Sequence, residues 1–195
     1  MTFPVVGLDC EWTPVRKKNQ KADVALLQIA TIDGSCFLFR TCLMDKISHS
    51  LAAFLDDPNI LKVGVGISTD VTFLKDKFNE LTIRSYFDLR HLARMCNIFS
   101  ERESLSDLTK AILDFELQKD IILDCVWEQT ILNESWVQYA ALDALVGVRI
   151  FEKLLPLFHE QESDEPFNVI SRIDLIKKYF INLGSPCYQF LNRNM

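Results

Sequence analysis

The chain has 195 residues, of which 49% are hydrophobic and 25% are charged, and its formal net charge is −6 at pH 7. This length and composition fit one folded domain and exclude a disordered or low-complexity chain. The negative charge argues against nucleic-acid binding through a broad basic surface, but it leaves room for a pocket in which metal ions supply positive charge.

The first forty residues are rich in strand-forming patterns. A strand is predicted over residues 5–12, followed by a polar, basic loop over 13–23 and by two β-rich segments within 24–40. Asp33-Gly34 lies between these two segments and is a strong hairpin signal. The first three strands are therefore expected to form an antiparallel meander.

Helices and strands then alternate. Ser48 is placed to cap a short helix, and residues 60–68 indicate a buried strand with glycines near its end. The apolar spacing that follows predicts, in order, a helix over Asp70–Phe78, a strand over 83–89, and helices over 90–96 and 104–113.

The longest predicted helix covers residues 133–158, with Asn133 as its cap and Pro156 close to its end. It is apolar nearly all round, so most of it should be buried. We expect a main domain over residues 1–158 and a C-terminal helical extension over 159–195. The extension could pair two subunits, contact a protein partner or contact substrate.

Four carboxylates occur where a purely structural sequence would avoid them. Asp9 and Glu11 end the first strand, and they point to the same face because side chains alternate along a strand. Asp70 follows the glycine-flanked strand, and Asp143 lies within the buried helix. Converging carboxylates repel one another and are costly to bury, so some positive charge should compensate them.

Divalent cations would compensate this repulsion. Carboxylate oxygens suit Mg²⁺ or Mn²⁺, and two such ions roughly 3.5–4 Å apart can activate a water and stabilise the leaving oxygen of a phosphodiester. Tyr139 lies one helical turn before Asp143 and on the same face. Its hydroxyl could therefore hold or deprotonate the attacking water.

The segments around these acids resemble a known family. DCEW followed by LLQIA, then VGVGISTD, then YAALDA is similar to the three-motif signature of the DEDDy 3′-to-5′ exonucleases, which include ribonuclease D and polymerase proofreading domains. Within that group the chain looks most like the Werner-type exonuclease domain and its small stand-alone relatives. The resemblance extends over roughly residues 4–158.

The resemblance implies an α/β fold of the ribonuclease H-like type, with a mixed sheet flanked by helices. In that sheet, parallel strands extend an antiparallel three-strand meander. The resemblance also implies that Asp9, Glu11 and Asp143 hold the metal ion nearest the nucleophilic water. Asp9 would bridge to a second ion, which Asp70 supports. The implied reaction is hydrolysis of the terminal phosphodiester at the 3′ end of single-stranded or frayed nucleic acid, releasing nucleoside 5′-monophosphates.

Several other residues are candidates for substrate binding. Trp12 could stack on terminal bases, and packing under the sheet is an equally good interpretation. Leu27 and Gln28 are candidates for lining the pocket, although an apolar strand residue is usually part of the core. The basic loop after the first strand could contact phosphate or remain solvated; its candidate residues are Arg16, Lys17 and Lys18.

Cysteine spacing and hydropathy bear on the compartment. The six cysteines include no C-x-x-C pair and no zinc-type spacing, which argues against a disulfide framework or a zinc site. Scattered thiols favour an intracellular protein. The sequence contains no charged-then-apolar leader before Val5 and no membrane-length apolar run, so we expect neither secretion nor membrane insertion.

Three alternative interpretations stay open at this point. One is an RNA-trimming exoribonuclease with the same mechanism, because the sequence does not decide between DNA and RNA. Another is an exonuclease-fold adapter that binds RNA or protein and is weak or inactive in catalysis. The presence of all four acids and Tyr139 counts against the adapter. The third is a nuclease module cut from a longer, helicase-linked chain.

Overall fold

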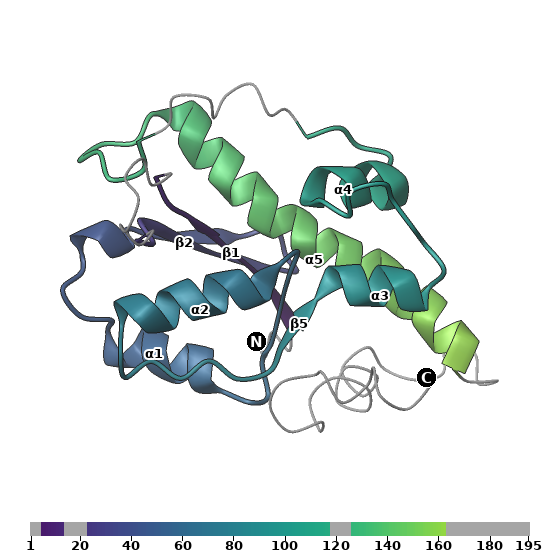
Figure 1. The fold of residues 1–195 in the computed structure, drawn as a ribbon, viewed down its shortest axis with the longest axis horizontal. Coiled ribbons are helices and arrows are strands. Elements are labelled where there is room, and N and C mark those ends of the chain that lie inside the picture. The colour runs from purple at the N-terminus through teal and green to yellow at the C-terminus, as the bar shows by residue number, and fades with distance from the viewer. Residues whose placement is uncertain (1–4, 14–22, 118–125, 163–195) are drawn as a thin grey trace.

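The computed structural model describes residues 5–13, 23–117 and 126–162 (Figure 1). Its centre is a five-stranded sheet with the strand order β3-β2-β1-β4-β5. The first three strands pair antiparallel, whereas β4 and β5 pair parallel beside β1, which confirms the expected meander with added parallel strands. The strand bounds are β1 Val5–Glu11, β2 Leu26–Thr31, β3 Cys36–Phe39, β4 Leu61–Gly64 and β5 Tyr86–Asp88.

Five α-helices and one short 3-10 helix complete the described chain. Their bounds are η1 Thr41–Leu43, α1 His49–Asp56, α2 Ile67–Lys77, α3 Leu89–Met95, α4 Leu105–Leu113 and α5 Glu134–Glu162. Ser48 caps α1 as predicted, because its hydroxyl accepts a hydrogen bond from the Leu51 amide. None of the described helices is long and apolar enough to cross a membrane.

The start of α2 was predicted three residues too late. The helix begins at Ile67, directly after Gly66, whose φ of +74° lies in the left-handed region that favours glycine. The Gly66 amide donates a hydrogen bond to the carboxylate of Asp88, a residue far away in the sequence. Asp70 therefore lies in the first turn of α2 and is only 4% exposed.

The end of α5 was predicted four residues too early. The helix continues to Glu162 and includes Pro156, which a helix interior normally disfavours. Leu154, Leu155 and Phe158 around this proline are at most 2% exposed, and their packing holds the helix through it. The expected C-terminal extension lies outside the described residues from residue 163 onward.

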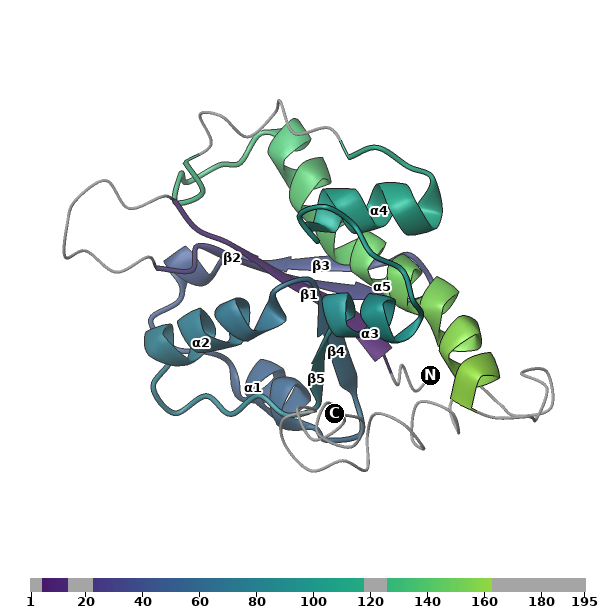
Figure 2. The ribbon, with the colours of Figure 1, turned by 45° about the vertical axis from the view of Figure 1, so that its right-hand side comes forward.

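The alternation of side chains along β1 divides the core between the two faces of the sheet. Val6, Leu8 and Cys10 pack in the hydrophobic cluster that also holds residues of α1 and α2. Gly7 and Asp9 point to the opposite face, which α5 covers together with α3 and α4 (Figure 2). The strand thus contributes apolar residues to one face and its two acids to the other.

Gly7 allows α5 to lie directly on β1. A Cβ atom added to Gly7 would lie 2.0 Å from the carbonyl oxygen of Ala144, which is a forbidden contact. Ala30 and Val148 pack at the same place, and each is completely buried. This close approach brings Asp143, the neighbour of Ala144 in α5, beside the acids of β1.

Lys62 is a buried lysine in the middle of β4. Its side chain is 0% exposed, and its ammonium donates hydrogen bonds to the carbonyl oxygens of Asp57 at 2.8 Å and Arg84 at 3.0 Å. Burial lowers the pKa of Lys62 to about 8, while Asp57 and Asp56 partly oppose this shift. The ammonium thus joins the end of α1 to the segment that enters β5.

We predict that Lys62→Met lowers the free energy of unfolding by about 2 kcal/mol at pH 7, because two buried carbonyl groups lose their donor. The pKa of Lys62 is lower in the folded state than the unfolded value of 10.5. The wild type should therefore gain stability relative to the variant as pH rises from about 8 to 10. Urea denaturation of both proteins at pH 7 and pH 9.5 measures this difference, and equal stabilities at both pH values would contradict it.

Candidate active site

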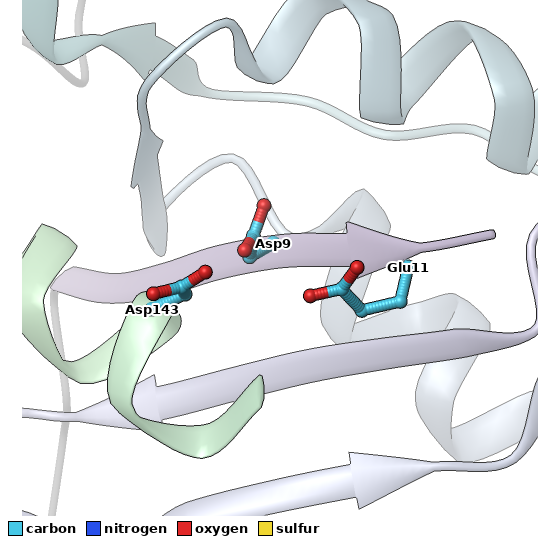
Figure 3. Close-up of side chains that lie close together, drawn as sticks. All are labelled: Asp9, Glu11 and Asp143. Atoms are coloured by element: carbon cyan, nitrogen blue, oxygen red, sulfur yellow. The ribbon is translucent and has the colours of Figure 1, made fainter. Parts of the chain in front are cut away.

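Three carboxylates converge where α5 crosses β1. Asp9 and Glu11 come from β1 and Asp143 comes from α5 (Figure 3). Each of them offers an oxygen, and these oxygens all lie within 4.8 Å of one another. Oxygen atoms at this spacing, from two elements that pack tightly together, are suited to hold a hard divalent cation.

Asp70 is the fourth acid, and it comes from the first turn of α2. It lies outside the group of oxygens within 4.8 Å, but it is close enough that the charge of Asp9 raises its pKa. The structure therefore brings three of the four predicted acids into one cluster and places Asp70 beside it.

The protonation of the acids is strongly perturbed. Burial, followed by the charge of Asp143, raises the pKa of Asp9 to about 8. Burial and the neighbouring acids raise the pKa of Glu11 to about 9, and burial and Asp9 raise that of Asp70 to about 9. At neutral pH these raised pKa values favour the protonated, uncharged acids. A bound cation would favour the ionised carboxylates instead.

Tyr139 lies one turn before Asp143 in α5, as predicted. Burial raises the pKa of its hydroxyl well above the ordinary value, and the charge of Asp143 and a hydrogen bond between the two side chains raise it further. A phenol in this state keeps its proton near neutral pH.

A cavity of about 210 Å³ opens at the cluster. Asp9, Glu11, Tyr139 and Asp143 line it together with Leu105 of α4 and with the end of β4. A Cβ atom on Gly64, at that end, would come within 2.5 Å of the Leu8 carbonyl oxygen, so only glycine fits. The site therefore combines acids, a phenol and closely packed backbone in one concave place, which is typical of an active site.

Comparison with known proteins identifies the group to which this arrangement belongs. Residues 1–158 match the 3′-5′ exonuclease domain family. The chain belongs to this 3′-5′ exonuclease family. The match includes every strand of the sheet, Asp9, Glu11, Asp70, Tyr139 and Asp143, which confirms the resemblance seen in the sequence.

Relatives place the exonuclease domain within longer proteins. The chain is 38% identical over 160 residues to human exonuclease 3′-5′ domain-containing protein 2, covering 78% of this chain and 25% of that protein. It is 34% identical over 151 residues to the mouse bifunctional 3′-5′ exonuclease/ATP-dependent helicase WRN, covering 77% of this chain and 11% of that protein. The chain therefore spans a quarter or less of these two relatives.

A solved structure shows the same fold at lower identity. Ribonuclease D of Escherichia coli, whose structure is described as that of an exoribonuclease involved in structured RNA processing, superimposes with a TM-score of 0.68 at 24% identity. The superposition covers 82% of this chain and 41% of the ribonuclease. The exonuclease domain thus has the ribonuclease H-like mixed sheet that the sequence resemblance implied.

The residues predicted to bind substrate do not all lie on the face of the sheet that carries the acids. Trp12 packs edge-on against Phe73 of α2, with ring centroids 4.9 Å apart, so it contacts the core on the α2 side.

The two candidates in β2 lie on opposite faces of the sheet. Leu27 is 0% exposed and packs in the cluster with Val6 and Leu8, on the face opposite the acids. Gln28 is also 0% exposed but occupies the face of Asp9. Neither Leu27 nor Gln28 is among the described residues that line the cavity. The basic candidates Arg16, Lys17 and Lys18 lie outside the described residues.

Asp88 supports the site and was missed in the sequence. It is 7% exposed at the end of β5, and it accepts hydrogen bonds from the Gly66 amide at 3.2 Å and from the Arg90 amide at 3.0 Å. The Arg90 guanidinium also binds its carboxylate. Asp88 thereby anchors the start of α2, which carries Asp70. The signal that could have revealed Asp88 is an acidic residue at the end of the short strand YFD.

We predict that the metal-free exonuclease domain loses stability as pH rises from about 4 to 9. The folded pKa values of Asp9 and Glu11, about 8 and 9, lie above their ordinary values of 3.8 and 4.5. A raised acid pKa contributes stability that is complete below the unfolded pKa and is lost as pH rises through the folded pKa.

The variant Asp9→Asn isolates this effect, because it removes one of the repelling charges. In chelator at pH 9 its melting temperature should exceed that of the wild type by about 4–8 °C, which corresponds to about 2 kcal/mol in a chain of this size. At pH 4.5 the two melting temperatures should differ much less. A variant that melts below the wild type at pH 9 would show that the acids do not repel one another in the folded protein.

Proposed function

We propose that this chain is a metal-dependent 3′-to-5′ exonuclease that hydrolyses the terminal phosphodiester of single-stranded or frayed nucleic acid and releases nucleoside 5′-monophosphates. The observation that carries the proposal is the cluster of Asp9, Glu11 and Asp143 oxygens within 4.8 Å, at a cavity that Tyr139 also lines. Membership of the 3′-5′ exonuclease family supports the direction of cleavage.

The donor set fits two divalent cations, Mg²⁺ or Mn²⁺. Asp9, Glu11 and Asp143 would hold one of them, and Asp9 with Asp70 would hold the other. Bound there, such cations supply an activated water and stabilise the charge that develops on the leaving oxygen. The raised pKa values of the acids support this fit, because only a nearby positive charge restores their ionised forms at neutral pH.

The chain's own residues orient the reaction. The protonated Tyr139 hydroxyl, beside Asp143, is placed to hold the attacking water at the phosphodiester. The net charge of −6 supports a substrate phosphate held mainly by the cations at this cavity. The basic loop with Arg16, Lys17 and Lys18 follows β1 directly, and we propose that it contacts phosphates further along the strand.

A denaturing-gel time course tests the proposal. Single-stranded DNA and RNA of one sequence, each labelled at the 5′ end, are incubated with the protein and Mg²⁺, Mn²⁺ or excess chelator. We predict a ladder that shortens from the 3′ end with either metal ion and disappears in chelator. The faster of the two substrates identifies the sugar preference, so RNA cleavage alone would support an exoribonuclease.

The variant Asp143→Asn should lower the rate by at least about 100-fold, since it removes a metal-ligand charge worth several kcal/mol in the transition state. It keeps the side-chain volume, so its melting temperature in chelator should not fall. Glu160→Gln is the matched control, because Glu160 is an exposed acid of the same helix, and it should retain full activity. Binding of the oligonucleotides without shortening under any condition would overturn the exonuclease and support the adapter.

A further inference from the structure

Gln28 is a buried polar residue beside the acid cluster. It lies in the middle of β2, is 0% exposed, and pairs across the antiparallel ladder with Asp9. Directly paired residues point to the same face of a sheet, so Gln28 lies under α5 on the face that carries Asp9 and Glu11. Its neighbours along β2 on that face are the buried apolar residues Leu26 and Ala30.

The side-chain amide of Gln28 has no hydrogen-bond partner in the described part of the chain. Neither its Nε2 nor its Oε1 atom has a partner among the residues that the structure describes, although both atoms are buried. A buried amide without hydrogen bonds destabilises a folded protein, whereas an apolar side chain of similar size would not. Among the described residues, no hydrogen bond offsets the burial of this amide, so its position next to the acid cluster suggests a partner there.

Two acids of β1 are within reach of the Gln28 side chain. Opposite residues of an antiparallel pair have Cβ atoms about 4.5–5.5 Å apart, and diagonal neighbours are about 7–8 Å apart, within reach of a long side chain. Asp9 is the opposite residue and Glu11 is a diagonal one. On its other side Gln28 pairs with the apolar Leu38 of β3.

We propose that Gln28 is a positioning residue, whose amide donates a hydrogen bond to the Asp9–Glu11 carboxylate pair when that pair binds a divalent cation. A carboxylate offers several lone pairs, and a metal ion uses only some of them. Hydrogen bonds to the rest fix the orientation of metal-binding carboxylates. This inference rests on the metal-dependent function proposed above, and it assigns the unpaired amide to the loaded state.

The variant Gln28→Met separates this role from a purely structural one. Methionine is close to glutamine in volume and shape but lacks its donor and acceptor, so it removes the buried unpaired atoms. We expect its melting temperature in chelator to equal or exceed that of the wild type. In the same protein, Mn²⁺ affinity measured by titration calorimetry should fall 10–100-fold, which is the usual cost of losing a hydrogen-bond partner of a metal ligand.

Steady-state kinetics on the oligonucleotide provide a second readout. The kcat of Gln28→Met at fixed metal concentration should fall, while KM for the oligonucleotide stays close to that of the wild type, since the amide contacts no substrate. Ile29→Met is the matched control, because Ile29 is the next residue of β2 and is buried on the opposite face. It should leave Mn²⁺ affinity and kcat unchanged.

The outcomes distinguish this inference from the proposed function. If the wild type binds Mn²⁺ and degrades the substrate while Gln28→Met does both equally well, the positioning role is overturned and the exonuclease stands. A Gln28→Met protein less stable than the wild type in chelator would also overturn it, because the amide would then be bonded in the metal-free protein. If the wild type neither binds Mn²⁺ nor degrades the substrate, both proposals fall.

Discussion

Mutual repulsion among closely spaced, partly buried carboxylates is the constraint on which this structure depends. Asp9, Glu11 and Asp143 offer oxygens within 4.8 Å of one another, and burial together with this proximity raises the pKa values of Asp9 and Glu11 to about 8 and 9. Such a cluster is unfavourable in isolation, so the surrounding core must hold it in place. Function and stability therefore oppose each other at this point of the fold.

The core meets this demand through the packing of one helix on one strand. Gly7 has no side chain, so α5 lies against β1, and Asp143 is held beside the two acids of the strand. Alternation along β1 sends Leu8 and Cys10 into the opposite core, which fixes the strand from behind. Asp88 accepts a hydrogen bond from the Gly66 amide and so fixes the start of α2, the helix that carries Asp70. The acids are thus positioned by elements that are separate in sequence.

Much of this arrangement could be predicted from local patterns. The hairpin at Asp33-Gly34, the cap at Ser48 and the acids of β1 all depend on neighbouring residues, and the family motifs supplied their order. The start of α2 could not be predicted in this way, because it depends on a positive φ at Gly66 and on the distant Asp88. Likewise, the helix continues through Pro156 because of tertiary packing.

The sequence could not decide which face of the sheet Leu27 and Gln28 occupy. The answer depends on strand register, since a shift of one residue exchanges the two faces.

The most direct test of the metal site is a structure of a protein crystal soaked in Mn²⁺, with data collected to locate manganese by its anomalous scattering. We predict manganese among the carboxylates of Asp9, Glu11 and Asp143, and a second ion toward Asp70. An ordered cavity without an anomalous peak at these carboxylates would contradict it.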